Sequence, residues 1–405
     1  MNINFIIQIQ MNKNTIRLQN KVNNLLKKNA NNLIPQRSPE WYLARNIALN
    51  ASEIAACLTH TEEVCKDYMT QFNLPNFKLD GKCCSHFDTR EDFIVNKGRA
   101  FFGENVFIDS IFTLWGKKYE EIATRMYRVV YKTDVLEFGS LVHPRLKWLR
   151  CSPDGITPDG TLVEIKCPFK RKINGIVPFH YYIQCMLQLE VCDLETCDFL
   201  ECELIELKTI QEFIDYELKE FNPGEFQHKG ILINKVSEPD NSETKYIYPP
   251  DSLITTDDYI NWYKNQQETI QEEITPIFYV IVKWNVIKVK RNKEWFSKII
   301  QPILKENHTF IRKLQNDKKL FDDYRESIRV IKNKKFIEMY NNTECLIGND
   351  DSDQDSDNQD DDDDYYDDYY WQDENENKNQ VENDVQDYKQ DEEDIQDNIC
   401  LLSEN

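Results

Sequence analysis

The hydrophobic periodicity of this chain changes near residue 132, and this change constrains the fold more than any other feature. From about Arg99 to Tyr131 apolar residues recur at three- and four-residue steps, which is typical of a helix. Val135–Val142 and Leu146–Cys151 then alternate, and Thr161–Lys166 is short and apolar, as expected of three strands. The chain therefore switches from a helical region to a sheet.

Further elements follow on both sides of these strands. Pro178–Val191 returns to helical spacing, and Thr196–Leu207 is another strand candidate. Ser38 and Pro39 are typical of a helix start, whereas residues 59–95 are predicted to be a polar loop. Helices, three strands, a helix and a strand in this order indicate an α+β or α/β layer architecture.

The C-terminal half is harder to interpret. Ile277–Trp284 and Val286–Arg291 are strand candidates, and Glu294 to about Tyr340 has a helical and basic pattern. Residues 350–405 contain 24 Asp and Glu against two Lys and so hold the whole formal net charge of −22. We expect residues 341–405 to be a disordered acidic tail, because they cannot bury enough apolar surface to fold. The neutral remainder is compatible with a polyanionic partner such as DNA.

Composition also limits the class of protein. No apolar run approaches the ~18–20 residues of a membrane span, and residues 1–34 are a low-complexity leader without the basic region of a signal peptide. The twelve cysteines form no C-x-x-C pair, so we expect reduced thiols in an intracellular protein of the cytoplasm or nucleus. Two metal-binding alternatives, an iron–sulfur set and half a zinc site, are set aside for want of the usual spacing. Their residues are Cys192, Cys197 and Cys202, and Cys83, Cys84 and His86.

Two carboxylates and a lysine are predicted to converge beside a turn. The Asp-Gly pair at residues 159–160 is a strong hairpin signal between the second and third predicted strands. Asp154 lies at the end of one strand, and Glu164 and Lys166 share a face of the next because strand side chains alternate. Ile165 points the other way, into the core, which leaves its carbonyl oxygen as a third ligand.

Such a ligand set suits a hard divalent cation. Mg²⁺ takes one or two carboxylates, keeps several waters and also binds substrate phosphates, and Mn²⁺ prefers similar oxygen ligands. A neighbouring lysine can hold the attacking water, so the combination suits metal-assisted hydrolysis of a phosphodiester. The alternative is an edge hairpin with a Glu–Lys surface pair.

Two helices contribute further candidates. Glu120 would face the sheet and add a third acid through a water, although an exposed helical glutamate is the alternative. Gln184 and Gln188 lie one turn apart on an otherwise apolar helix and therefore share a face. This spacing indicates either a polar site or a buried network.

Basic residues suggest contacts with phosphates. One cluster, residues 166–172, includes Lys170 and Arg171 and directly follows Glu164, and a second spans residues 288–293. A nuclear localisation signal or a solvated surface is the alternative for either cluster. The tail interleaves aromatic residues with carboxylates, and we hypothesise that it competes with DNA or recruits a basic partner, with a purely solubilising role as the alternative.

From Arg37 to about Leu207 the sequence resembles the phage lambda exonuclease / YqaJ-type viral recombinase family of PD-(D/E)XK nucleases. Six motifs occur in the family's order: R-S-x-x-W-x-x-x-R from Arg37, A-S-x-I-A from Ala51, W-G-K-x-Y-E-x-x-A from Trp115, S-P-D-G from Ser152, V-E-I-K-C-P from Val163, and Y-x-x-Q with Q-x-E-V from Tyr181. The resemblance implies an α+β fold with an α/β/α-type, restriction-endonuclease-like core, a mixed sheet flanked by helices. It implies an exonuclease domain over residues 35–340, with a core at 37–207 and a C-terminal helical extension at 208–340.

The resemblance also implies roles for matched residues. Asp154, Glu164 and the Ile165 carbonyl would ligate catalytic Mg²⁺ or Mn²⁺, and Lys166 would serve the attacking water. Glu120 would be an accessory acid.

Three more matched positions are Gln184, which would steady the cluster, and Arg45 and Ser52, which would hold the terminal 5′-phosphate of DNA. By this analogy the enzyme digests one strand of duplex DNA from a 5′ end, in viral recombination or repair. Some family members form a ring-shaped trimer around DNA and work with a single-strand annealing protein, so a homotrimer and such a partner are expected. A structure-selective endonuclease and a catalytically idle DNA-binding scaffold are the alternatives.

Overall fold

The computed structural model describes residues 3–31, 34–58, 62–74, 89–104, 110–217, 228–235 and 245–344. The predicted disordered tail lies almost entirely outside the described residues, as do Cys83, Cys84 and His86. Within the described part of the chain, no helix is long and apolar enough to cross a membrane.

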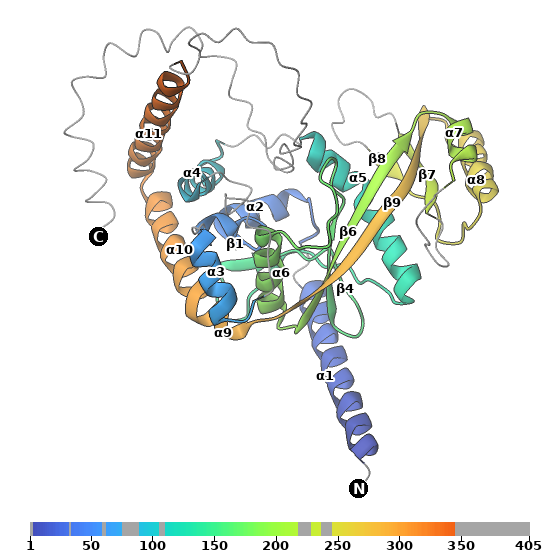
Figure 1. Ribbon diagram of the computed structural model, residues 1–405, viewed down its shortest axis with the longest axis horizontal. Helices are drawn as coiled ribbons and strands as arrows, with labels where there is room; N and C mark the ends of the chain where they lie inside the picture. Colours follow the sequence, from blue (N-terminus) through green and yellow to red (C-terminus); the bar gives the residue numbers. More distant parts are fainter. Residues whose placement is uncertain are drawn as a thin grey trace, which may run out of the picture.

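A six-stranded mixed sheet forms the centre of the molecule, with the strand order β4-β5-β6-β9-β7-β8 (Figure 1). The strands are β4 (Gly155–Ile156), β5 (Thr161–Lys166), β6 (Thr196–Leu207), β7 (Lys229–Lys235), β8 (Lys245–Ile247) and β9 (Ile274–Lys290). β5 and β6 pair in parallel, and α6 (Phe179–Cys192) makes the crossover between them. The α+β class and the strands predicted at residues 161–166 and 196–207 are confirmed.

A second, small sheet corrects the predicted hairpin. It contains β1 (Leu49–Asn50), β3 (Leu149–Cys151) and β2 (Leu141–Val142) in that order. The Asp-Gly turn at residues 159–160 pairs β5 with β4, not with the strand that ends at Cys151. The reason is Pro153, which cannot donate a backbone hydrogen bond and so separates β3 from β4.

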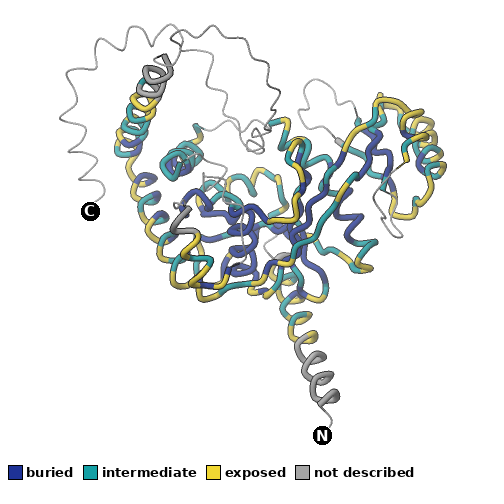
Figure 2. The backbone as a smooth tube through the Cα atoms, viewed as in Figure 1, coloured by how far each residue is buried: buried dark blue, intermediate teal, exposed yellow. Residues whose placement is uncertain are grey.

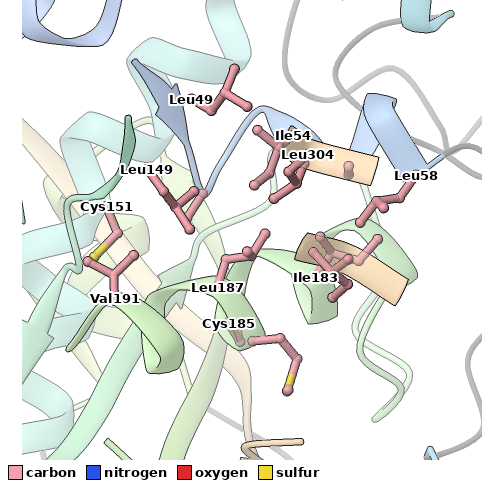
Figure 3. Packing of buried hydrophobic residues seen from close by; sticks show 14 of the residues in the cluster. Leu49, Ile54, Leu58, Leu149, Cys151, Ile183, Cys185, Leu187, Val191 and Leu304 are labelled. Carbon is pink, nitrogen blue, oxygen red and sulfur yellow. The ribbon is translucent and has the colours of Figure 1, made fainter. Parts of the chain in front are cut away.

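Alternation along the strands places two helices on opposite faces of the large sheet. Val163 and Ile165 pack with Tyr119 and Ile122 of α5 (Ile111–Tyr131). Leu162 and Phe199 face the other way and join α6 in a larger core. This core also includes Leu49, Ile54, Leu149, Ile183, Leu187 and Leu304 (Figure 3). Nearly every residue of α6 is buried, which Figure 2 shows as dark blue.

The predicted C-terminal extension is an integral part of this fold. β9 pairs along all twelve residues of β6, and the two separately predicted strands at 277–284 and 286–291 are one strand. The helical pattern after residue 294 is confirmed, with a break at Asp317. Its elements are α9 (Lys293–Trp295), η2 (Phe296–Ile300), α10 (Gln301–Asn316) and α11 (Lys318–Glu344). Trp295 and Leu304 lie in the same core as α6.

A separate lobe lies beyond the far end of β6 and β9 (Figure 1). It contains α7 (Ile210–Asp215) and α8 (Thr256–Thr269) around a small core of Phe213, Ile231, Tyr259 and Phe278. Lys229 is buried there, and its ammonium donates to the carbonyls of Phe213, Ile214 and Tyr216. This lysine satisfies carbonyls at the end of α7 that have no partner within the helix.

The N-terminal region has more structure than its sequence predicts. It contains α1 (Ile3–Asn31), α2 (Pro39–Ile47), η1 (Ile54–Leu58), α3 (Glu62–Gln71) and α4 (Arg90–Phe101). The leader packs against the body through buried Val22 and a 2.8 Å ion pair between Lys21 and Asp193. The prediction of a loop over residues 59–95 is wrong for α3 and the start of α4, because Phe72, Leu74 and Phe93 bury their side chains in the main core.

Candidate active site

The hairpin turn fixes the position of Asp154 relative to β5. Gly160 has a φ of +88°, a left-handed conformation that glycine adopts without steric cost. Gly155 pairs with Val163, so the preceding residue, Asp154, lies beside the end of β5. The backbone N–H of Ile165 donates to Oδ2 of Asp154 at 2.7 Å. Because the N–H and C=O of one strand residue point to the same side, the Ile165 carbonyl faces Asp154 as well.

Glu164 is held from both sides by the two glutamines of α6. The residue is only 1% exposed. Gln184 Nε2 donates to Oε1 at 2.5 Å, and Gln188 Nε2 donates to Oε2 at 2.7 Å. The predicted shared face of the glutamines is confirmed, and their function here is to satisfy a buried carboxylate that would otherwise be costly.

Lys166 completes this cluster. Its ammonium lies 3.0 Å from Glu164 Oε1 and 4.6 Å from the centre of the Tyr181 ring. A cation over an aromatic face is attracted by the ring's electrons. The lysine is therefore oriented by a carboxylate on its own strand and a ring on α6.

The electrostatics of Asp154 are unusual for an aspartate. Desolvation raises its pKa well above the ordinary value, and the nearby carboxylates of Glu164 and Glu120 add to this effect. Lys166 and the Ile165 hydrogen bond act in the opposite direction but are outweighed. Excess negative charge around a carboxyl is the condition that a cation would relieve.

Glu120 lies at the rim of this cluster. It comes from α5, and its carboxylate pairs with Arg37 at 2.7 Å. Both side chains are about one-third exposed or more. Arg37 has a φ of 67°, a left-handed conformation that is strained for a residue with a side chain. Glu120 is thus positioned by Arg37, which is the first residue of the R-S-x-x-W-x-x-x-R motif that ends at Arg45.

The residues present fit a hard cation with few protein ligands. Asp154, Glu164 and the Ile165 carbonyl could supply oxygens, and Mg²⁺ characteristically completes its shell with waters. Among the described residues, no group of three or more His, Cys, Asp and Glu side chains is arranged to hold a metal ion. Within the described part of the chain, Glu120 therefore does not form a three-carboxylate metal site with Asp154 and Glu164.

Arg45 and Ser52 come together beside Trp41. Arg45 Nη2 donates to Ser52 Oγ at 3.1 Å, and its guanidinium lies 4.5 Å from the Trp41 ring centre. Trp41 Nε1 in turn donates to Ser152 Oγ at 2.8 Å, two residues before Asp154. Trp41 therefore connects the predicted phosphate-binding pair to the carboxylate cluster.

The two predicted basic clusters are largely neutralised within the protein. Arg171 lies 2.6 Å from the fully buried Glu201, whereas the neighbouring Lys170 is exposed. In the second cluster, Lys288 pairs with Asp198, and Arg291 is buried against Glu190 at 2.6 Å. Lys170 and Lys288 are exposed, and in the described part of the chain Lys288 is the one of these two that pairs with a carboxylate, that of Asp198.

Several residues around the site carry no motif-level signal. Lys97 and Glu53 form a buried ion pair beside Arg45, with 2.5 Å between Lys97 Nζ and Glu53 Oε1. Glu53 stands at a variable position of the A-S-x-I-A motif, and Lys97 precedes the region predicted to be helical. The cysteines of the set-aside iron–sulfur alternative, Cys192, Cys197 and Cys202, are buried free thiols.

Comparison with known proteins finds a family model that covers this site. Residues 40–195 match the family model of the YqaJ-like viral recombinase domain. Asp154, Glu164, Lys166 and Gln184 lie within the matched segment. The similarity to this family supports interpretation of the site as that of a nuclease.

Individual relatives are more distant. Protein R354 of Acanthamoeba polyphaga mimivirus is 27% identical over 287 residues, which are 61% of this chain and 52% of that protein. The chain thus matches about half of that relative's length. Among solved structures, the alkaline exonuclease LHK-Exo from Laribacter hongkongensis is similar with a TM-score of 0.37 and 15% identity, covering 70% of this chain and 98% of the other. A phage-related exonuclease from Haemophilus somnus 129PT has a TM-score of 0.31 and 14% identity, with 59% and 90% covered.

Proposed function

We propose that this chain is a divalent-metal-dependent deoxyribonuclease that digests duplex DNA from a 5′ end. The observation that carries the proposal is the convergence of Asp154, Glu164 and Lys166 beside the end of β5, with Glu164 buried and clamped by α6. These groups match the ligands and the lysine that metal-assisted phosphodiester hydrolysis needs.

In this proposal Asp154, Glu164 and the Ile165 carbonyl hold Mg²⁺ or Mn²⁺. When bound, the cation supplies positive charge that polarises the scissile phosphate and favours deprotonation of water. Lys166 orients the attacking water. Gln184 keeps Glu164 in place, and this positioning reduces the reorganisation needed as charge develops.

The preference for a 5′ end rests on the Arg45–Ser52 pair. Arg45 presents a guanidinium, and guanidinium groups recognise phosphates with directed hydrogen bonds. Its connection through Trp41 and Ser152 to Asp154 would place a terminal phosphate near the site of hydrolysis. Glu120 would act as an accessory acid through a water. Exposed Lys170 remains a candidate for contact with a backbone phosphate of DNA. Arg171 could make such a contact only if its ion pair with Glu201 were broken.

An assay on end-labelled linear and covalently closed circular duplex tests the proposal. With Mg²⁺, the linear DNA is expected to be degraded from its 5′ ends and the circle left intact, and EDTA should stop the reaction. Asp154→Ala should lower the rate by roughly 10³-fold or more, the scale of losing several kcal/mol of transition-state stabilisation. Asp134→Ala, which removes an exposed carboxylate from the same region, is the matched control.

The other outcomes separate the alternative functions. Nicking of the circle would identify a structure-selective endonuclease and overturn the exonuclease assignment. Binding of DNA without cleavage of either substrate would identify a catalytically idle scaffold and overturn the nuclease proposal.

Assembly and partners stay predictions drawn from the family. A ring-shaped homotrimer is expected to appear as a threefold mass in light scattering of the purified chain, and a monomeric mass would contradict it. A single-strand annealing protein is expected to co-purify when the two are expressed together.

A further inference from the structure

The positive charge of Arg45 is partly neutralised by a carboxylate of the protein itself. Glu53 Oε2 lies 3.6 Å from Arg45 Nη2, and the Glu53 side chain is only 12% exposed. A carboxylate in this position competes with an incoming phosphate for the guanidinium and repels it, since like charges interact more strongly where water is scarce. Taken alone, the Arg45–Glu53 pair has no net charge to attract an anion.

Lys97 of α4 changes this balance. Its side chain is 4% exposed, and Nζ lies 2.5 Å from Glu53 Oε1. The same ammonium donates to the backbone carbonyl of Arg45 at 2.7 Å. Lys97 therefore binds the competing carboxylate and the residue that carries the guanidinium at once.

Asn50 secures the carboxylate from the opposite direction. Its backbone N–H and its side-chain amide both donate to Glu53 Oε1, at 3.0 and 2.8 Å. Burial raises the pKa of the Glu53 carboxyl, but the charges of Lys97 and Arg45 and these hydrogen bonds outweigh burial and leave the pKa below its usual value. Glu53 thus stays ionised. Burial lowers the pKa of the Lys97 ammonium, and the charge and hydrogen bond of Glu53 act in the opposite direction. With Lys97 protonated, the three groups carry two positive charges and one negative charge.

The described contacts also leave Arg45 able to reach a ligand. Its Ser52 and Glu53 contacts both involve Nη2. A guanidinium has donors on all three nitrogens, and the Arg45 side chain is 20% exposed. Among the described residues, Nε and Nη1 have no such polar contact, so an anion could bind there without displacing Ser52.

We propose that Lys97 is a positioning residue that occupies Glu53 and so leaves the positive charge of Arg45 available to the terminal phosphate of a DNA end. This inference rests on the proposed function, which assigns Arg45 and Ser52 to that phosphate. Lys97 makes no contact with DNA in this account. It acts by cancelling the charge of Glu53.

The test measures binding without cleavage. The full-length chain is titrated in EDTA with two fluorescent duplexes that differ only in carrying a 5′-phosphate or a 5′-hydroxyl. The readout is the ratio of the two dissociation constants, and thermal melting is recorded for every variant. A role of Lys97 in stability alone would lower the melting temperature and leave the ratio unchanged.

Removing the lysine charge should abolish most of the preference for phosphate. Lys97→Met leaves Arg45 facing an uncompensated Glu53, and the ratio is expected to fall by about tenfold or more. Lys229→Met is the matched control, because Lys229 is equally buried but lies in the α7–α8 lobe. That control should lower the melting temperature without changing the ratio.

A second variant keeps the test decisive if Lys97→Met does not fold. Glu53→Gln with Lys97→Met removes both members of the pair, so no charge is left buried alone, and Arg45 keeps its net positive charge. The ratio in this double variant is expected to stay within about threefold of the parent value. Loss of the preference here would mean that Lys97 itself attracts the phosphate, and would overturn the proposal.

Failure of this inference is distinguishable from failure of the proposed function. If the parent protein does not cleave linear DNA with Mg²⁺, the nuclease proposal fails. If it cleaves and prefers 5′-phosphate ends but Lys97→Met keeps the full preference, the nuclease proposal stands and the role of Lys97 is wrong.

Discussion

Two charged clusters, one around Asp154 and one around Arg45, are built in a similar way but have opposite net charge. The acidic cluster, Asp154, Glu164 and Lys166, contains two carboxylates and one ammonium. The Arg45 cluster, Arg45, Glu53 and Lys97, contains two cations and one carboxylate. In each cluster the single group of opposite charge contacts a buried partner: Lys166 contacts Glu164, and Glu53 contacts Lys97. The first is therefore suited to a cation and the second to an anion, which are the two components of a phosphodiester end bound with a metal ion.

The clusters also differ in how their carboxylates are fixed. Glu164 receives the amides of two glutamines from one helix, whereas Glu53 receives a lysine from α4 and the amides of Asn50. Both carboxylates also pair with a lysine, Lys166 in the first cluster and Lys97 in the second. The sign of each site is therefore set by its third group, which is the carboxyl of Asp154 in the first and the guanidinium of Arg45 in the second.

The largest effect is expected from replacing Lys166, the lysine of the acidic cluster. Lys166→Met should lower cleavage by roughly 10²- to 10³-fold, because a positioned group that aids proton transfer contributes on that scale. Single-turnover cleavage of linear duplex with Mg²⁺ measures the loss, and Lys264→Met, at an exposed lysine of α8, is the control. A loss below about tenfold would show that Lys166 only balances charge, as Lys97 is proposed to do.

A smaller effect is expected from the second glutamine. Gln188→Leu removes the donor to Glu164 Oε2 but keeps Gln184 on Oε1. The carboxylate is then free to rotate, and cleavage should fall by about tenfold, as small misplacements of a catalytic group cost. Met186→Leu, on the same helix, should leave the rate unchanged. Equal rates for Gln188→Leu and the parent protein would show that one amide suffices.

Asp154 provides a test through stability instead of activity. Its native pKa is raised, so the folded protein binds this proton more tightly than the unfolded chain does. Stability is therefore lost as the pH rises from the ordinary carboxyl value of about 4 through the native pKa. In EDTA, Asp154→Asn should melt a few degrees above the parent at pH 8, and the gap should narrow toward pH 5.

Addition of Mg²⁺ extends this measurement. Binding to the native state should raise the melting temperature of the parent at pH 8 but not that of Asp154→Asn. The exposed control Asp134→Asn should follow the parent under every condition. A parent protein that melts above Asp154→Asn in EDTA at pH 8 would contradict the raised pKa.

The smallest effect is expected at the rim. Arg37 and Glu120 are both partly exposed, and such ion pairs contribute about 0–1 kcal/mol. Arg37→Ala should change cleavage by less than about threefold, since Glu120 is placed outside the direct ligands. Arg37→Gly should melt at or above Arg37→Ala, because glycine relieves the left-handed backbone strain. A large loss of cleavage in both variants would show that Glu120 has a direct role in the site and is not an accessory acid.

Local sequence patterns predicted the acidic cluster because its residues are brought together by short-range structure. Strand alternation puts Glu164 and Lys166 on one face, the Asp-Gly turn brings Asp154 beside them, and helical spacing aligns Gln184 with Gln188. The sequence did not reveal that Pro153 would move the hairpin partner from β3 to β4. Pro153 lies between those two strands and lacks a backbone hydrogen-bond donor, and β3 pairs instead with β1 and β2.

The Arg45 cluster was only half predictable for a physical reason. Arg45 and Ser52 were found by resemblance, but Lys97 reaches them from 52 residues away through the packing of α4. Burial of a lysine depends on which carboxylate the fold brings to it, and no spacing rule encodes that. The same holds for Arg171 and Arg291, which looked available for phosphate contacts in the sequence. The fold pairs them with Glu201 and Glu190, buried acids that lie far from them in the sequence.

The length of β9 has a practical consequence for dissecting the molecule. Its 17 residues span about 55 Å and cover the whole outer side of β6. A fragment cut at Leu207, where the family motifs end, would retain every proposed ligand yet expose an unprotected strand edge along β6. Such edges recruit other chains, so we expect that fragment to aggregate, and the smallest useful piece to extend through α10.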